Sequence, residues 1–237
     1  MRPARDLVFW LGLSALVLAG CGGPPAAPGP AEPAATPPDG LEFVPPPPGT
    51  YDLPAIQAAA DGVVVDADGT TRRLFDYLGD RYVLLSFIYS RCTNPKGCPL
   101  ATMTLRRIES GLRADPELAA QTRLLSLSFD PEHDTPDLML RFAAEDYLDT
   151  RWDQRQWSFL TTASRLDLQP ILDGYGQYIV RELDESGKET GDLSHVLKVF
   201  LIDRERRVRN IYSSDYIHPD LAINDLRTLI GQQAERL

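Results

Sequence analysis

The chain has 237 residues, of which 43% are hydrophobic, and its formal net charge at pH 7 is −10. This length and apolar content suit a domain with a sizeable core. An acidic chain repels nucleic-acid phosphates, so we expect no nucleic-acid partner.

The first twenty residues predict an export signal. Arg2 and Arg5 precede an apolar run from Leu7 to Gly20. At 1.5 Å per residue this run spans about 21 Å, less than the roughly 30 Å of a bilayer core. A positive start, a short apolar run and small residues are typical of a cleaved signal. The last four positions, LAGC, resemble the lipobox of bacterial lipoproteins, which implies cleavage before Cys21 and a lipid on its sulfur.

The alternatives for this segment are an ordinary secretory signal and an anchor that stays uncleaved. Lipidation would leave Cys92 and Cys98 as one pair in an oxidising compartment. Removing residues 1–20 takes away two of the 24 basic and one of the 34 acidic residues, which leaves 22 and 33. We therefore expect the protein to be exported and to be anchored by its lipid on the periplasmic side of the cell membrane.

Residues 21–50 predict a tether that begins at the lipidated cysteine. Residues 22–50 contain eleven of the twenty prolines and few large apolar side chains. Such a segment cannot form a core and favours polyproline II structure. At roughly 3.1 Å per residue it reaches at most about 90 Å. The folded domain is expected over 51–237.

Within the domain, the apolar patterns predict alternating strands and helices. Residues 62–74 predict a hairpin around a D-A-D-G turn. The remaining strands are expected at 82–90, 123–129, 157–160, 177–183, 196–203 and 207–213, and helices at 98–112, 135–148 and 218–237. This order indicates an α/β, thioredoxin-like fold, with a central mixed sheet flanked by helices and an N-terminal hairpin. A flavodoxin-like sheet is the alternative.

Cys92 and Cys98 flank the junction between a buried strand and the following helix. Five residues separate them, which matches neither a C-x-x-C redox pair nor a zinc knuckle. A helix start favours a thiolate at Cys98, the form that attacks disulfides and binds soft metals. A purely structural disulfide here would contribute only about 2.4 kcal/mol, which a domain of this size hardly needs.

Two thiolates need a third ligand to complete a metal site, and the chain has three histidines. His195 precedes a strand whose start, in a thioredoxin-like topology, lies beside the cysteine loop. His218 is expected to cap the last helix, and His133 to lie in a turn before a helix capped by Asp134 or Thr135. Two sulfurs and one imidazole suit copper better than catalytic zinc.

Five segments together resemble the SCO/SenC family of copper-binding, thioredoxin-fold proteins. They are FIYSRC at 87–92, CPLATM at 98–103, DPEHDTP at 130–136, WSFLTT at 157–162 and HVLKVFLID at 195–203, and the resemblance covers about residues 55–235. It implies copper, as Cu(I) or Cu(II), bound by Cys92, Cys98 and His195. It also implies delivery of copper to the CuA site of cytochrome c oxidase subunit II, or reduction of the cysteines at that site.

The chain differs from the family pattern at three places. The family loop is usually C-x-x-x-C, whereas five residues lie between Cys92 and Cys98. Ser194 stands where an acidic residue usually precedes the histidine. Thr162 stands where glycine is common.

The sequence is also compatible with two other functions. The first is a thiol–disulfide oxidoreductase with Cys92 as nucleophile, which would act on a CuA-type or other exported client and use a thioredoxin-like reductant. The second is a peroxide-reducing or redox-sensing protein. A peroxidase ordinarily has Thr or Pro close before its reactive cysteine, but here Ser90 and Arg91 precede Cys92.

Overall fold

The computed structural model describes residues 36–143 and 153–234, which belong to one compact unit that begins at Thr36. The expected signal peptide, the lipidation site Cys21 and tether residues 21–35 lie outside the described residues. Within the described ranges, no helix is long and apolar enough to cross a membrane.

An eight-stranded mixed sheet forms the centre of the unit, in the order β1-β10-β9-β4-β5-β6-β2-β3. Its strands are β1 (Gln57–Ala58), β2 (Val63–Asp66), β3 (Thr71–Arg73), β4 (Tyr82–Ile88), β5 (Thr122–Ser128), β6 (Trp157–Thr161), β9 (Val199–Ile202) and β10 (Arg207–Tyr212). Strands β4, β5 and β6 are parallel, whereas the other pairs are antiparallel. The antiparallel β9 beside β4 confirms the thioredoxin-like prediction over the flavodoxin-like one, and the N-terminal hairpin is β2–β3.

The central strands are buried on both faces. Every residue of β4, β5 and β6 is buried. This explains the nearly continuous apolar run of β4, YVLLSFI, whereas β5 (TRLLSLS) and β6 (WSFLT) also bury Ser, Thr and Arg side chains. The strand predicted over 82–90 ends at Ile88, so Tyr89 and Ser90 belong to the loop that leads to the cysteines.

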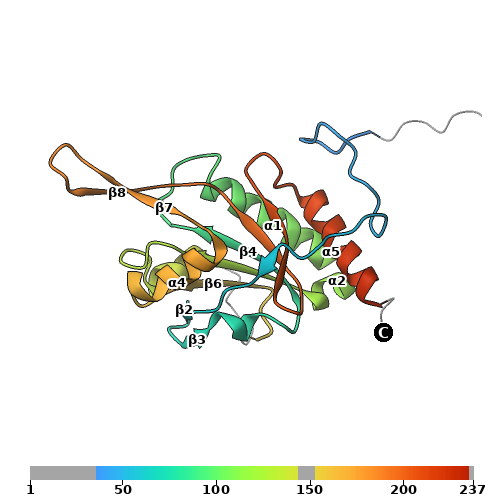
Figure 1. Cartoon of the computed structure of the whole chain (residues 1–237), viewed down its shortest axis with the longest axis horizontal. Helices are drawn as coiled ribbons and strands as arrows, with labels where there is room; N and C mark the ends of the chain where they lie inside the picture. The colour runs from blue at the N-terminus through green and yellow to red at the C-terminus, as the bar shows by residue number, and fades with distance from the viewer. Residues whose placement is uncertain (1–35, 144–152, 235–237) are drawn as a thin grey trace, which may run out of the picture. The chain divides into compact units, whose positions relative to one another are not determined.

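Helices cover both faces of the sheet (Figure 1). They are α1 (Cys98–Ala114), α2 (Pro116–Gln121), α3 (Pro136–Ala143), α4 (Arg165–Tyr175) and α5 (Pro219–Ala234), with a 3-10 helix η1 (Leu74–Tyr77). Tyr82 of β4 donates a hydrogen bond to Leu229 O of α5 at 3.1 Å. Phe87, an odd number of residues later in β4, packs against Tyr175 of α4 at 5.6 Å between ring centroids. Since side chains alternate along a strand, α5 and α4 lie on opposite faces.

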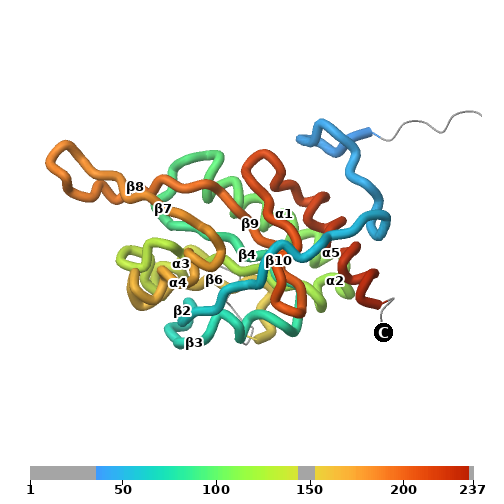
Figure 2. The backbone as a smooth tube through the Cα atoms, viewed as in Figure 1, coloured from blue at the N-terminus to red at the C-terminus, as the bar shows by residue number. Residues whose placement is uncertain are grey.

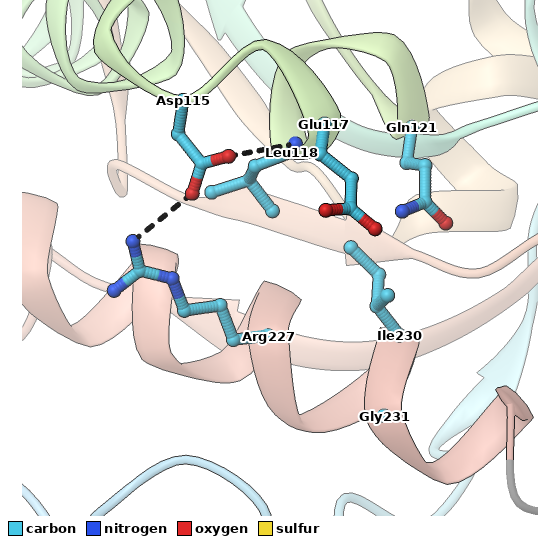
Figure 3. A pocket seen from close by; sticks show the side chains of 7 residues that line it. All are labelled: Asp115, Glu117, Leu118, Gln121, Arg227, Ile230 and Gly231. Atoms are coloured by element: carbon cyan, nitrogen blue, oxygen red, sulfur yellow. Dashed lines mark hydrogen bonds and ion pairs between the residues drawn. The ribbon is translucent and has the colours of Figure 1, made fainter.

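The contact between α2 and α5 lies away from the cysteines and helps to fix the terminal helix. Asp115 caps α2 by accepting a hydrogen bond from Leu118 N at 3.1 Å, and it pairs with Arg227 of α5 at 3.2 Å (Figure 3). These groups border a cavity of about 250 Å³ that has no cysteine or histidine in its lining. The cavity is therefore separate from the predicted metal ligands.

The end of the proline-rich segment contacts α5. Gly49 N donates to Thr228 Oγ1 at 2.9 Å, and the hydroxyl of Tyr51 donates to Asp225 Oδ1 at 2.6 Å. Asp225 is buried and also accepts a hydrogen bond from Tyr212 of β10. These contacts fasten residues 49–51 to the folded unit.

A two-stranded hairpin, β7 (Ile179–Leu183) and β8 (Glu189–His195), is separate from the main sheet. It projects from the body of the unit, as Figures 1 and 2 show. Strand β8 was not predicted, because we placed His195 immediately before a buried strand rather than at the end of another strand. Helix α4 was not predicted either. The predicted helix over 135–148 is observed as α3, and its last residues, 144–148, lie outside the described part of the chain.

Candidate metal centre

Three different elements bring the predicted ligands together. Cys92 lies in the loop after β4, Cys98 is the first residue of α1, and His195 is the last residue of β8. Their ligand atoms all lie within 4.8 Å of one another, and Cys98 Sγ is 3.7 Å from His195 Nε2. The cysteines are free thiols. The structure thus forms the cluster that the sequence predicted.

The cysteine loop stays compact despite its five intervening residues. Gly97 N donates to Asn94 O at 2.9 Å, and the Asn94 side chain accepts a hydrogen bond from Lys96 N at 3.0 Å. A Cβ on Gly97 would lie 3.2 Å from Cys92 Sγ, so glycine allows the sulfur to approach the backbone. The longer loop therefore folds into a turn that leaves the two sulfurs close together.

The imidazole of His195 is held in one orientation. Its Nδ1 lies 2.9 Å from Leu193 O. Because a carbonyl oxygen can only accept, Nδ1 carries the proton in this contact and the neutral ring keeps a lone pair on Nε2. The rings of Phe129 and Tyr89 pack against the imidazole at centroid distances of 4.8 and 5.7 Å. Nε2 is thereby directed toward Cys98 as a ligand atom.

Burial dominates the chemistry of Cys98. We predicted that the helix start would favour its thiolate, and this prediction is wrong for the metal-free protein. Cys98 is 2% exposed, and burial raises the pKa of its thiol, with the nearby Cys92 adding to the effect. Burial also raises the pKa of Tyr89, to about 12, so its hydroxyl stays protonated. A bound cation would supply the positive charge needed to displace the thiol proton.

One side of the sulfur pair borders a cavity of about 270 Å³. Its lining includes Tyr89, Pro99, Met103 and Phe142 besides the two cysteines. Cys92 is partly exposed, whereas Cys98 is buried. A partner or reagent that enters the cavity would therefore meet Cys92 more easily.

The other two histidines have the local roles that the sequence predicted. His218 Nδ1 accepts a hydrogen bond from Asp220 N at 3.3 Å at the start of α5, and its Nε2 donates to Asp39 O at 2.9 Å. His133 lies in a turn, where its N–H donates to Asp130 O at 3.0 Å. Neither belongs to the ligand cluster.

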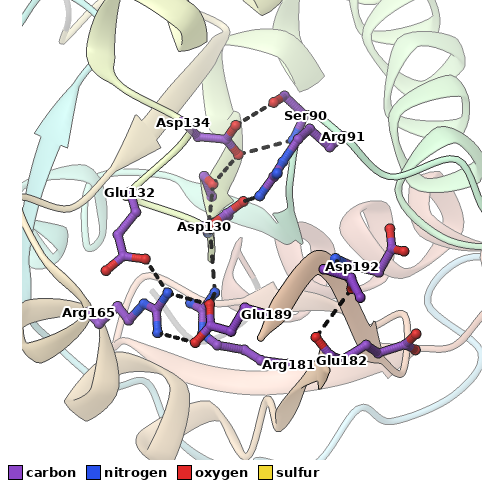
Figure 4. A network of polar contacts seen from close by, with 12 residues as sticks. Ser90, Arg91, Asp130, Glu132, Asp134, Arg165, Arg181, Glu182, Glu189 and Asp192 are labelled. Atoms are coloured by element: carbon purple, nitrogen blue, oxygen red, sulfur yellow. Dashed lines mark hydrogen bonds and ion pairs between the residues drawn. The ribbon is translucent and has the colours of Figure 1, made fainter. Parts of the chain in front are cut away.

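The role of Asp134 was not recognised from the sequence. Thr135 caps α3 by accepting from Leu138 N at 3.3 Å. Asp134 instead accepts hydrogen bonds from Ser90 N at 3.0 Å and from the hydroxyls of Ser90 and Ser128 (Figure 4). The buried carboxylate therefore fixes the backbone two residues before Cys92. The DPEHDTP motif was the available signal, but we considered Asp134 only as an alternative to Thr135 for the helix cap.

A thioredoxin-like fold with two thiols and an imidazole converging at one point defines a class of metal-binding or thiol-active proteins. The family model SCO1/SenC matches residues 57–231, and the chain belongs to this family. No curated protein matches the sequence closely enough to count as a relative.

Solved structures of the family share this fold. Copper-bound ScoI from Arabidopsis thaliana is 16% identical, with a TM-score of 0.59 over 74% of this chain and 99% of that one. Apo Sco1 from Thermus thermophilus is 23% identical, with a TM-score of 0.59 over 76% and 95% of the two chains. A SCO1/SenC family lipoprotein from Bacillus anthracis str. Ames is 20% identical, with a TM-score of 0.59 over 74% and 97%. At these identities the likeness shows the fold.

Proposed function

We propose that the protein is a membrane-tethered copper metallochaperone that binds copper through Cys92, Cys98 and His195. The observation that carries this proposal is the convergence of two Sγ atoms and one Nε2 within 4.8 Å. Thiolates favour Cu(I), and imidazole ligates copper in either oxidation state. The Arabidopsis relative and the yeast Sco1 structure, which is 15% identical, both hold copper.

The copper would be cargo that the protein delivers to the CuA site of cytochrome c oxidase subunit II. A relative of 23% identity, BsSco, is described as a member of a family of cytochrome c oxidase assembly proteins. Cys92 is the more exposed of the two sulfurs, and it borders the open cavity. A client thiolate could therefore replace Cys92 first, and the ion would pass on by ligand exchange without full release.

The tether would place this site near its client. Cleavage after residue 20 and a lipid on Cys21 would hold the protein on the extracytoplasmic face of the cell membrane. The family lipoprotein from Bacillus anthracis supports this arrangement. Residues 22–38 would then span the distance between the lipid and Asp39, whose carbonyl oxygen accepts a hydrogen bond from His218 Nε2 at 2.9 Å.

An anaerobic Cu(I) titration of reduced residues 36–237 tests the proposed site. We expect one copper per protein, with tight binding lost in Cys92→Ser, Cys98→Ser and His195→Ala. His218→Ala is the matched control, since His218 caps α5 and should leave copper binding unchanged. Wild-type affinity in His195→Ala would refute the ligand assignment.

A second candidate function is thiol–disulfide exchange on a client protein. The specific observation in its favour is that both thiols are free and close, with Cys92 partly exposed and Cys98 buried as a resolving thiol would be. In that reaction Cys92 would attack the client disulfide and Cys98 would release the reduced client. His195→Ala separates the two functions, because it should abolish tight copper binding but leave disulfide reduction largely intact.

A further inference from the structure

A group of charged side chains joins the cysteine loop to the hairpin that carries His195 (Figure 4). We call it the stem cluster, and its members are Arg91, Asp130, Glu132, Arg165, Arg181 and Glu189. Arg91 directly precedes Cys92, whereas Arg181 and Glu189 belong to β7 and β8. The cluster therefore connects the two parts of the chain that supply the metal ligands.

Asp130 is the shared partner at the centre of the stem cluster. Its side chain is only 2% exposed, and it pairs with Arg91 Nη2 at 2.6 Å and with Arg181 Nη1 at 3.8 Å. Arg181 lies opposite Leu193 in the hairpin register. Leu193 supplies the carbonyl that orients His195. One buried carboxylate thus links the residue before Cys92 to the backbone that positions the imidazole.

A close approach at Gly191 of β8 provides a second, independent contact. Gly191 has φ +93°, and a Cβ there would lie 2.5 Å from Arg91 Nη1 and 3.1 Å from its Cζ. The Arg91 guanidinium therefore rests directly against the hairpin backbone. Only glycine leaves room for this contact and adopts the backbone conformation without strain.

The hairpin needs such a support because it is separate from the main sheet. A two-stranded hairpin is marginally stable by itself in water. Farther along the stem, Glu189 pairs with Arg165 of α4 at 2.7 Å, and Arg165 also pairs with Glu132. This outer pairing holds the hairpin to α4. Arg91, in contrast, holds it to the cysteine loop.

We propose that Arg91 is a positioning residue that fixes the distance between the two cysteines and His195. It acts through Asp130 and the Gly191 backbone, without touching the metal. The inference rests on the proposed copper site, since copper affinity is one of its readouts. Loss of the support lets β8 move away from the loop, and the three ligands then converge less often.

The first test compares Arg91→Ala with Arg227→Ala, which removes an ion pair of α5 far from the ligands. In reduced residues 36–237, Arg91→Ala should lower Cu(I) affinity about 10- to 100-fold, the usual effect of losing a group that orients a metal ligand. In the metal-free protein, amide exchange across 189–195 should become about tenfold faster. Arg91→Lys should recover part of both effects, because it restores a cation beside Asp130. Arg227→Ala should change neither quantity.

The second test is a double-mutant cycle between Arg91→Ala and Gly191→Ala. Gly191→Ala alone should weaken copper binding. The loss of copper affinity should be clearly smaller when residue 91 is already alanine, because the new Cβ then no longer clashes with the Arg91 guanidinium. Gly187→Ala is the matched control, since Gly187 has φ +83° in the same hairpin and a Cβ there would meet no other described part of the chain within 4 Å. It should leave copper affinity unchanged.

Two results would overturn the proposal. One is an Arg91→Ala protein whose hairpin exchange and copper affinity both stay within about twofold of wild type. The other is a cycle in which the two substitutions are additive. A wild-type protein that binds no copper would instead refute the proposed function, and exchange across 189–195 in the metal-free variants would still decide the role of Arg91.

Discussion

Removing the buried carboxylate of Asp134 should be one of the most damaging single changes to this domain. Asp134 is fully buried and lies between the loop after β4 and the end of β5. Its oxygens accept hydrogen bonds from Ser90 N and from the hydroxyls of Ser90 and Ser128. Asp134→Ala leaves these donors without their acceptor in a site closed to water.

The expected loss follows from these three hydrogen bonds. Each hydrogen bond to a charged group contributes about 1.5–3 kcal/mol. Removing the buried charge recovers part of this sum, because burying a carboxylate is itself costly. We therefore expect Asp134→Ala to lower the free energy of unfolding by about 3–5 kcal/mol. Asp134→Asn should cost less, because its amide keeps one acceptor oxygen.

Urea unfolding of residues 36–237, followed by circular dichroism, measures this loss directly. Asp137→Ala is the matched control, because Asp137 is an exposed aspartate in the first turn of α3. It should cost less than about 1 kcal/mol, the usual contribution of an acidic residue near a helix start. A loss below about 1 kcal/mol for Asp134→Ala would show that its hydrogen bonds do not support the loop.

Two further predictions concern ionisation and reactivity. Burial alone would raise the pKa of Asp203, but hydrogen bonds from Arg209 and Arg207 lower it below the usual 3.8. The charged form of Asp203 therefore stabilises the fold above about pH 3.8, and this stabilisation is lost as the pH falls through the lowered pKa. Asp203→Asn should reduce the free energy of unfolding by about 1–3 kcal/mol at pH 7. In urea unfolding at pH 3, the difference in the free energy of unfolding between wild type and this variant should be smaller. An equal difference at both pH values would contradict this prediction. In the metal-free protein at pH 7.5, iodoacetamide should modify the partly exposed Cys92 about tenfold faster than the buried Cys98. Peptide mass spectrometry measures the two rates. Equal rates would mean that burial does not protect Cys98.

The central sheet was predictable because burial on both faces leaves a clear pattern. The sequence of β4 is a nearly continuous apolar run, β5 contains three leucines, and no Gly, Pro, Asn or Asp interrupts either strand. The terminal helix α5 was predictable from His218 and Pro219 at its start. These features depend on residues close together in the chain, so the sequence alone displays them.

Strand β8 and helix α4 left no comparable pattern. Most residues of β8 are exposed or half-buried, and the strand contains a glycine with positive φ, so hydrophobic alternation could not identify it. Helix α4 carries Pro170 in its interior, which normally argues against a helix. Gly191 is an unusual residue inside a strand. Its close contact with the Arg91 guanidinium accounts for it, and this contact exists only in the folded structure.

The three metal ligands were predictable from the sequence, whereas the residues that position them were not. Cysteine and histidine are chemically distinctive, and the topology of the predicted fold brought Cys92, Cys98 and His195 to one place. Arginine and aspartate are common on any surface. Although Arg91 and Asp130 lie in the FIYSRC and DPEHDTP segments, nothing in the sequence indicated that their side chains pair in the folded protein. The burial of Cys98 was equally invisible, although it decides the direction of its pKa shift.

The five-residue spacing between the cysteines does not decide how far apart their sulfurs lie, because a different part of the fold places each cysteine. Cys98 is placed by the start of α1, and Cys92 by the loop that Asp134 holds after β4. The extra residues between them only have to close a turn, which Asn94 and Gly97 do. Since closure entropy rises slowly with length, two added residues cost little. Sulfur separation is therefore set by the framework around the loop, and a longer spacing is compatible with a three-ligand copper site.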